Sequence, residues 1–346
     1  MTINIINFMN TTDKVLKYLK GKKTASGKEI ADFLGISRQA VNKHLKALIG
    51  NGEIVKKGIT KGALYKIAGK TRPEKRLGKS YILKGLEEDR IFNELELFLN
   101  LKKYLRENVL DIVRYAFTEL LNNAIEHSYS KIGDIEAIVD QYRYFFRIRD
   151  YGIGIFSSIH KKFDLPDENA AIGELLKGKT TTMRERHTGE GIFFTSKSGD
   201  TITFRSHKIN LIFDNIKQDI FVEKKRFIKG TEVTFSISRS SKKALEEVFR
   251  IYAPEDFDYK FEKTYVYVKL FQNEYISRSE ARRLLSGLDK FKEIILDFKG
   301  VKSLGQGFAD EVFRVFKNQN PNIAIKTENL SPVIGSMIKH VIDNKI

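Results

Sequence analysis

The stretch Phe117-Thr-Glu-Leu-Leu-Asn-Asn-Ala-Ile-Glu-His127 decides how the middle of this 346-residue chain is interpreted. It closes a predicted helix over 107–127, in which residues three or four positions apart share a face. Glu119 and Asn123 are separated by one turn. The apolar side of the same helix comprises Val113, Phe117, Leu120, Leu121 and Ala124. The pattern therefore predicts that a carboxylate and an amide point together away from the core.

Two glycine turns follow this helix. A predicted strand over 142–149 ends at Asp150-Tyr-Gly-Ile-Gly154, and His187-Thr-Gly-Glu-Gly-Ile192 opens a further predicted helix. Glycines let the backbone pass close to a flat ring, and a carboxylate can accept a hydrogen bond from the exocyclic amine of adenine. The N–H groups at a helix start suit phosphate. Together these parts predict an ATP site.

The chemistry of such a site assigns roles to the helix residues. Phosphates arrive with Mg²⁺, which takes oxygen ligands and keeps several waters, so the amide oxygen of Asn123 suffices as the protein ligand. Glu119 is the candidate general base for an attacking water or hydroxyl. A basic, hydroxyl-rich segment over 177–187 separates the glycine turns and is expected to be a lid. The alternative for Glu119 and Asn123 is a solvated polar stripe on the helix. The alternative for the segment over 177–187 is an ordinary surface loop.

The order of these elements, followed by Gly230-Thr-Glu-Val-Thr-Phe235, resembles the GHKL ATPase superfamily over residues 90–240. The resemblance implies an α/β sandwich with the Bergerat nucleotide fold, and we place this domain at 81–240. In this family pattern Asp150 and Thr231 hold adenine, Asn123 holds magnesium, and the second glycine turn holds phosphate. The nucleotide-binding residues implied are Asn123, Asp150, Gly152, Gly154, Lys179, Thr188, Gly189, Gly191, Ile192 and Thr231.

Within that superfamily, residues 119–129 resemble most closely the anti-sigma-factor serine kinases. This similarity implies an alternative function as a serine/threonine kinase with Glu119 as base, or as a slow ATPase. A standard two-component histidine kinase is not expected, because the phosphoacceptor histidine should precede the ATP domain and residues 80–118 contain no histidine. The helix predicted over 86–105 is interpreted instead as a packing or dimer helix.

The positive charge is concentrated at the N-terminus. Residues 1–79 contain 18 Lys or Arg and 5 Asp or Glu, so they carry +13 of the net +17. Lys and Arg that neutralise phosphates gain affinity by releasing counterions, and this concentration fits a nucleic-acid partner. Helices are predicted over 12–20, 28–34 and 37–49, and two short strands over 53–67. The turn between the second and third helices holds a glycine, which is helix-turn-helix geometry.

This segment resembles winged helix-turn-helix regulators, most closely over 36–48, and we place the domain at 10–68. The resemblance implies that the third helix enters the major groove of DNA, where Arg, Gln and Asn can read base edges. A role in protein contacts alone is the alternative. Residues 69–80 are rich in Gly, Pro and charge and are predicted to be a linker. The candidate DNA-binding residues are Ser37, Arg38, Gln39, Asn42, Lys43, Lys46 and Lys61.

The C-terminal part alternates strands and helices. Strands are predicted over 265–271, 293–298 and 323–325, and helices over 279–288, 307–316 and 332–343. This alternation predicts a small sheet covered by helices, and residues 294–303 with 307–313 resemble STAS-like domains attached to ATP-binding proteins. We place the domain at 262–346. The same segment resembles the STAS domain of anti-sigma-factor antagonists. Those proteins carry an acceptor serine at the start of the helix, but this chain has Gly305-Gln-Gly307 there, which leaves only Ser303 nearby.

Composition restricts the remaining possibilities. The chain has no cysteine, so disulfides, thiolate metal sites and cysteine nucleophiles are excluded. No run reaches the ~18–20 apolar residues of a membrane span. We therefore expect a cytoplasmic regulator with no membrane contact, in which the nucleotide state of the middle domain tunes binding of DNA or of a regulatory, sigma-factor-like protein. The expected cofactors are ATP and Mg²⁺, and the expected assembly is a homodimer.

Overall fold

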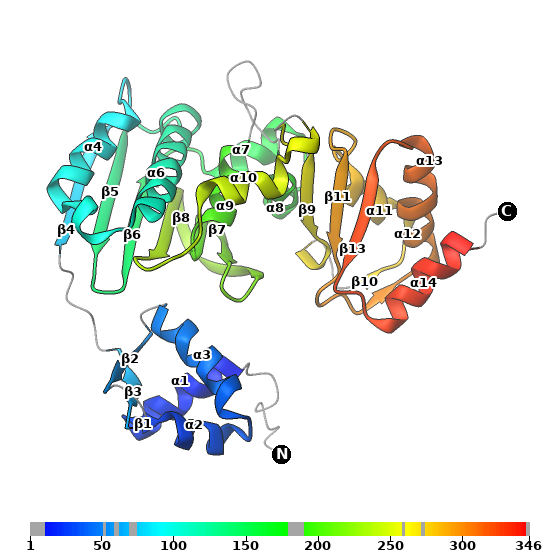
Figure 1. Ribbon diagram of the computed structural model, residues 1–346. Coiled ribbons are helices and arrows are strands. Elements are labelled where there is room, and N and C mark those ends of the chain that lie inside the picture. Colours follow the sequence, from blue (N-terminus) through cyan, green and yellow to red (C-terminus); the bar gives the residue numbers. More distant parts are fainter. Residues whose placement is uncertain are drawn as a thin grey trace.

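The computed structural model describes residues 11–50, 53–58, 62–68, 75–178, 190–257, 260–270 and 274–343. Figure 1 shows a small helical unit at the N-terminus, a central sheet with helices packed on it, and an α/β unit at the C-terminus. Each of the three has its own hydrophobic cluster. In the part of the chain described here, no helix combines the length and the apolar character that crossing a membrane requires.

The N-terminal unit has the three helices and two wing strands expected from the sequence. It comprises α1 (Thr11–Lys22), β1 (Ala25–Ser26), α2 (Gly27–Leu34), α3 (Arg38–Gly50), β2 (Ile54–Lys57) and β3 (Leu64–Ile67). Ser26 Oγ accepts a hydrogen bond from the Glu29 backbone N–H at 3.2 Å, and the Glu29 carboxylate accepts one from the Ser26 N–H at 2.7 Å. This capping box begins α2, and Gly35, at φ 65°, ends it. The short turn to α3 follows.

The central unit is built on a five-stranded sheet of antiparallel neighbours in the order β4-β5-β6-β8-β7. Its strands are β4 (Lys75–Ile82), β5 (Ile132–Val139), β6 (Arg143–Asp150), β7 (Thr201–Asp214) and β8 (Asp219–Ser238). The helices of this unit are α4 (Glu88–Leu99), α5 (Leu101–Tyr104), α6 (Glu107–His127), α7 (Ile155–Lys162), α8 (Glu168–Lys177) and α9 (Gly191–Ser198).

The two faces of this sheet differ because side chains alternate along each strand. Tyr144, Phe146 and Ile148 of β6 are buried on the face that α6 covers. On the opposite face, Glu136 pairs with Arg147 at 3.0 Å and Glu232 pairs with Arg149 at 3.6 Å. One apolar face under helices and one face of ion pairs make this a two-layer α/β unit.

One expected boundary is wrong. Residues 75–80, predicted to belong to a linker, form most of β4, while 69–74 lie outside the described residues. All eight residues of β4 pair with β5, so the segment is an edge strand. Its Lys79 contacts Glu94 at 2.8 Å and its Arg76 contacts Glu136 at 2.5 Å. Edge strands tolerate such charge, which is why composition suggested a linker.

The helix predicted over 86–105 is divided in two. Asn100 adopts a left-handed conformation at φ 54° between α4 and α5. Its N–H closes α4 by donating to the carbonyls of Glu96 and Leu97. Asn is among the few residues that accept this conformation at low cost, so the break is local and the two helices keep packing on the same core.

The C-terminal unit has a parallel sheet in the order β13-β11-β9 and a two-stranded pair β10-β12. The alternation expected from the sequence is present, although the strand predicted over 265–271 ends at Tyr267. The strands are β9 (Lys263–Tyr267), β10 (Glu274–Tyr275), β11 (Glu293–Asp297), β12 (Ser303–Leu304) and β13 (Ala324–Glu328). The helices are α10 (Leu245–Tyr252), α11 (Arg278–Leu285), α12 (Gln306–Asp310), α13 (Lys317–Gln319) and α14 (Pro332–Asp343), with short 3-10 turns at Glu255–Phe257 and Val268–Leu270 and a π-helical turn at Glu311–Phe316.

Candidate functional site

A cavity of about 290 Å³ opens beside α6 in the central unit. Glu119 and Asn123 both line it, one turn apart, as the helical spacing predicts. The Asn123 side-chain N–H donates to the Glu119 carbonyl at 2.7 Å. This hydrogen bond fixes the amide so that its N–H is used within the helix. Asn123 Oδ1 is then the atom that is suited to a cation or another donor.

Asp150 lies at the end of β6 on another wall of this cavity and is only 4% exposed. Its Oδ1 accepts hydrogen bonds from the backbone N–H of Gly152 at 2.9 Å and of Thr231 at 3.2 Å. The Thr231 hydroxyl in turn accepts from the Ile155 N–H at 2.9 Å. The Thr231 side chain also hydrogen-bonds to the Asp150 carboxyl. This carboxyl is a buried acceptor of a kind that fits an amine on a ligand.

Burial also sets the acidity of this carboxyl. Loss of solvation raises the pKa of Asp150, and the hydrogen bonds from Gly152 and Thr231 partly oppose that rise. An amine donor from a ligand would stabilise the charged form further. The electrostatics therefore favour a ligand that donates a hydrogen bond at this point.

Three glycines shape the same wall. A Cβ at Gly152 would collide with the Ser128 carbonyl, and one at Gly230 would collide with the Asp150 backbone. Gly154 and Gly230 have φ of 83° and 75°, which residues with a side chain rarely adopt. These close approaches bring the Asp150 turn, the end of α6 and β8 into contact. Gly152 therefore supports the cavity without lining it.

The opposite end of the cavity is the start of α9. Gly191 lies so close to Glu119 that a Cβ at Gly191 would collide with its carboxylate. Tyr115 and Glu190 line this end as well. Burial raises the pKa of the Tyr115 hydroxyl, and the charges of Glu119 and Glu190 raise it further. The acidic groups and the backbone N–H groups of the helix start thus meet at one place, which suits a phosphate carried with a cation.

The structure brings together residues that the sequence separates widely. Seven of the sequence-predicted site residues line this one cavity: Glu119, Asn123, Asp150, Gly154, Gly191, Ile192 and Thr231. Three others, Lys179, Thr188 and Gly189, lie outside the described residues. Among the residues that the structure describes, no three His, Cys, Asp or Glu side chains cluster as a preformed metal site, so Asn123 as a magnesium ligand stays a prediction.

Sequence reasoning missed several lining residues. Tyr115 lies one turn before Glu119 on the same helix face, so the spacing could have revealed it. Gly230 supports the wall from behind without lining it, and the turn that directly precedes Thr231 could have marked it. Phe249 comes from α10, far along the chain, and no local signal marks it. Only the tertiary fold places this ring at the cavity.

Lys177 is not part of a lid, contrary to the expectation from the sequence. It was predicted to begin a flexible segment over the triphosphate, but it ends α8 and is only 1% exposed. Its ammonium donates to Glu174 at 2.5 Å and to the Ser286 carbonyl at 2.7 Å. A desolvated lysine needs such partners, so Lys177 is an anchor between α8 and the C-terminal unit. The rest of the expected lid, apart from Gly178, falls outside the described residues.

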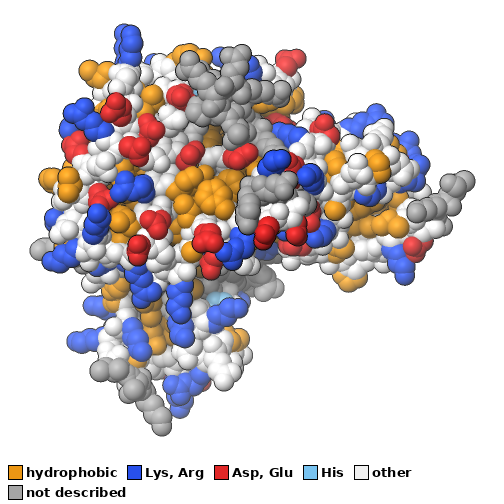
Figure 2. Space-filling view, turned by 45° about the horizontal axis from the view of Figure 1, so that its top comes forward, with side chains coloured by type: hydrophobic (Ala, Val, Ile, Leu, Met, Phe, Trp, Pro, Cys, Tyr) orange, Lys and Arg blue, Asp and Glu red, His pale blue; other side chains and the backbone are white. Residues whose placement is uncertain are grey.

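The third helix, α3, is the second candidate site. The sequence-predicted contacts Ser37, Arg38, Gln39, Asn42, Lys43 and Lys46 are all exposed on α3 or its N-terminal turn. Val41, Leu45 and Leu48 of α3 are buried in the N-terminal core. Figure 2 shows Lys and Arg side chains projecting from this unit, in the lower part of the view. Lys61, expected in the wing, lies outside the described residues.

Comparison with protein families identifies the two terminal units. Residues 11–67 match the model of an HTH domain, and residues 280–334 match that of a STAS-like domain of unknown function. No match was found among curated proteins. The helix-turn-helix and STAS-like predictions are thereby confirmed at the level of domain type. The protein is a multidomain α/β chain with an HTH domain at its N-terminus and a STAS-like domain at its C-terminus.

Proposed function

We propose that this protein is a DNA-binding regulator whose central unit binds ATP with Mg²⁺ in the manner of GHKL domains. The observation that carries the proposal is the cavity itself. It unites a buried carboxylate at Asp150, an amide at Asn123 and a glycine helix start at Gly191. One end suits a purine amine and the other suits phosphates. Such a pairing of polar ends in one concave site is typical of cofactor pockets.

Different residues of the cavity would hold different parts of the ligand. Asp150 and Thr231 would hold the adenine, with Oδ2 of Asp150 accepting its amine. The N-terminus of α9 would hold phosphate, and Asn123 would supply one oxygen to magnesium. When bound, the ion neutralises phosphate charge next to Glu119 and Glu190. ATP therefore fits the donor and acceptor set that the cavity offers.

The output of this regulator would be DNA binding through α3. Six exposed polar or basic residues lie at one helix and its turn, and the N-terminal segment has a large positive charge. In this arrangement Arg38, Gln39 and Asn42 would read bases, while Ser37, Lys43 and Lys46 would contact phosphates. A homodimer would present two such helices to two half-sites.

A nucleotide titration tests the proposal. Purified full-length protein is titrated with ATP in Mg²⁺ by calorimetry, and its affinity for a fluorescent DNA selected from random sequence is measured with and without ATP. The expected result is saturable ATP binding and a change in DNA affinity of about fivefold or more, as for other allosteric couplings. Absence of ATP binding at millimolar Mg²⁺ would overturn the nucleotide site. Binding of ATP with unchanged DNA affinity would overturn its regulatory role.

A second candidate function is catalytic turnover, as an ATPase or a serine/threonine kinase. The observation that favours it is the position of Glu119 against Gly191, at the end of the cavity where phosphate is expected. A carboxylate there is placed to take a proton from water or from a hydroxyl of a partner protein. Ser303, the acceptor considered within the chain, lies in β12 of the STAS-like unit and does not line the cavity.

Labelled ATP separates these reactions. Release of labelled phosphate indicates hydrolysis, and label retained on protein indicates transfer. If Glu119 is the base, Glu119→Gln abolishes either reaction and preserves ATP binding, because the substitution keeps the size of the side chain. Turnover that persists in Glu119→Gln would exclude Glu119 as the base.

A further inference from the structure

The cavity lies between two hydrophobic cores. Leu120, Ile148 and Phe204 line it from the core of the central unit. Phe194 of α9 and Phe249 of α10 line it as well, and these two rings pack with the core of the STAS-like unit. Figure 1 shows α9 and α10 between the two sheets. A molecule in the cavity would therefore touch side chains that belong to both cores.

A continuous series of rings runs from the cavity into the C-terminal core. The ring centroids of Tyr115 and Phe249 are 5.4 Å apart, and those of Phe249 and Phe194 are 4.5 Å apart. Phe194 is 5.1 Å from Phe261, which is 5.4 Å from Phe291. We call these five residues the aromatic bridge. Tyr115, Phe249 and Phe194 line the cavity. Phe261 and Phe291 do not line it and are buried in the core behind it. Packed rings transmit displacement because interiors are nearly incompressible.

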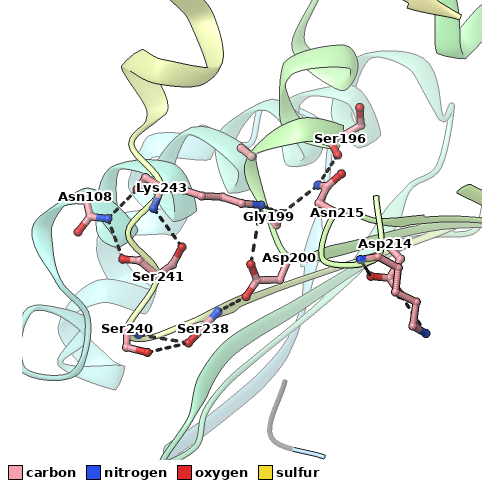
Figure 3. A network of polar contacts seen from close by, with 12 residues as sticks. Asn108, Ser196, Gly199, Asp200, Asp214, Asn215, Ser238, Ser240, Ser241 and Lys243 are labelled. Carbon is pink, nitrogen blue, oxygen red and sulfur yellow. Dashed lines mark hydrogen bonds and ion pairs between the residues drawn. The ribbon is translucent and has the colours of Figure 1, made fainter. Parts of the chain in front are cut away.

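The C-terminal end of α9 is held by a network of hydrogen bonds, which Figure 3 shows. The Asn215 side-chain N–H donates to the carbonyls of Ser196 and Gly199, each at 2.9 Å. Lys243 donates to the Gly199 carbonyl at 2.6 Å. The Ser238 N–H donates to Asp200 at 2.7 Å. With its C-terminus fixed to the central sheet, α9 can respond to a ligand mainly by movement at its N-terminus.

A polar contact from α9 reaches the C-terminal sheet. The Lys197 ammonium donates to the Tyr267 hydroxyl at 3.0 Å and lies 5.3 Å from the ring centre of Tyr265. Both tyrosines belong to β9, the strand nearest the central unit. On α8, the Lys177 carbonyl accepts from the Thr264 hydroxyl of β9 at 2.5 Å. Two helices of the central unit are thus attached to the same strand.

From these contacts we propose that the STAS-like unit senses occupancy of the cavity through the aromatic bridge. This inference rests on the proposed nucleotide site and names its route of regulation. A nucleotide that contacts Phe194 or Phe249 changes how α9 and α10 pack on β9, and the packing of β9 changes the affinity of the cavity in return. Such coupling is reciprocal by thermodynamic necessity. The STAS-like unit is then a determinant of nucleotide affinity although none of its strands lines the cavity.

The test uses a residue of the bridge that does not line the cavity. Phe261→Leu alters the packing between Phe194 and Phe291, and we expect the ATP dissociation constant of the full-length protein to change threefold or more. Phe308→Leu is the matched control, because Phe308 is an equally buried ring of the same core that packs on Tyr275. Its ATP affinity should match that of the wild type. Equal ATP affinities in all three proteins would overturn the proposal.

Hydrogen exchange in the wild type gives a second measurement that needs no variant to fold. ATP with Mg²⁺ should slow exchange at the amides of β9 and α10 and leave α14, on the far side of the STAS-like unit, unchanged. Protection confined to the central unit would overturn the coupling while ATP binding itself stands. A wild type that binds no ATP in either experiment instead removes the proposed function, so the two failures are distinguishable.

Discussion

In the proposed nucleotide site, Asp150 is the buried acceptor for the adenine amine. Asp150→Asn keeps Oδ1 as an acceptor for Gly152 and Thr231 but replaces Oδ2 by an N–H donor, which would face the adenine amine. Hydrogen bonds to charged groups contribute about 1.5–3 kcal/mol, so we expect ATP affinity to fall about tenfold to a hundredfold. Calorimetric titration measures this loss. Asp289→Asn, at an exposed position, is the control for lost charge and should bind ATP normally.

The same substitution, which should weaken ATP binding, should favour the folded state at neutral pH. Because burial raises the pKa of Asp150, its ionised form is disfavoured in the folded state, and the stability it contributes is lost as the pH rises through that pKa. The free energy of unfolding of Asp150→Asn, taken relative to that of the wild type, should therefore be higher at pH 7 than at pH 4. Denaturant unfolding at both pH values measures the difference. A variant that is destabilised equally at both would show that the substitution damages the turn.

Lys197 makes a second residue-scale prediction. Burial among aromatic rings lowers the pKa of Lys197 to about 7, and Asp297 partly opposes the shift. Between about pH 7 and the ordinary lysine value of 10.5, the unfolded chain binds a proton that the folded protein does not, so stability rises with pH over this window. Below it, both states are protonated and the effect is constant.

Lys197→Met should flatten that rise. Burial also lowers the pKa of Lys177 and Lys243, so the variant should keep the part of the pH dependence that these two lysines contribute. The measurement is the difference in melting temperature between pH 7 and pH 9 for the variant and the wild type. Lys302→Met, at an exposed position, removes the same charge and should leave the wild-type difference intact. An unchanged difference in Lys197→Met would contradict the assignment.

Among the elements, α3 carries the prediction about DNA. Lys43 and Lys46 are exposed on this helix, and each phosphate contact contributes about 0.9 to the slope of log affinity against log salt. Lys43→Ala with Lys46→Ala should weaken DNA binding on all sequences and reduce the slope by nearly two. Fluorescence anisotropy over a range of salt concentrations measures both effects. Lys302→Ala, in the STAS-like unit, is the control for loss of an exposed positive charge outside α3, and a parallel loss of DNA binding there would contradict the assignment to α3.

The last helix offers a prediction about stability. Gly335 lies inside α14 with a helical backbone, and an added Cβ would meet no atom within 4 Å. Gly335→Ala should therefore raise the free energy of unfolding by about 0.5–1 kcal/mol. Gly300→Ala should lower it, because Gly300 has φ 80°. Chemical denaturation of both variants checks the signs, and destabilisation by Gly335→Ala would show that α14 is packed more tightly than this structure indicates.

Elements with strong periodicity were predictable, and those defined by pairing were not. The α6 helix begins and ends where the sequence places it, since its apolar positions repeat over 21 residues. β4 was mistaken for a linker because Lys75, Arg76 and Lys79 carry no strand signal without β5 beside them. Helix α10 and its Phe249 were missed for a similar reason. Local pattern could name the polar groups of the cavity, but its aromatic wall depends on contacts between distant segments.

The arrangement of cores predicts how the whole molecule unfolds. Phe193 and Phe194 of the central unit belong to the hydrophobic cluster of the STAS-like unit, whereas the N-terminal cluster contains only residues of the HTH domain. The central and C-terminal units should therefore unfold together in one calorimetric transition, and the HTH domain should unfold in another. Ligands stabilise only the unit that binds them, and ATP at a hundredfold excess over its dissociation constant contributes about 2.7 kcal/mol.

Scanning calorimetry of the full-length protein measures both transitions. ATP with Mg²⁺ should raise the temperature of the larger transition and leave the smaller one in place, while DNA should raise the smaller one. Because regulation requires the two sites to communicate, ATP and DNA added together should shift at least one transition by more than either ligand does alone. Three separate transitions would contradict the shared packing of α9. Two transitions whose shifts are strictly additive would leave the HTH domain and the nucleotide cavity as independent binding units on one chain.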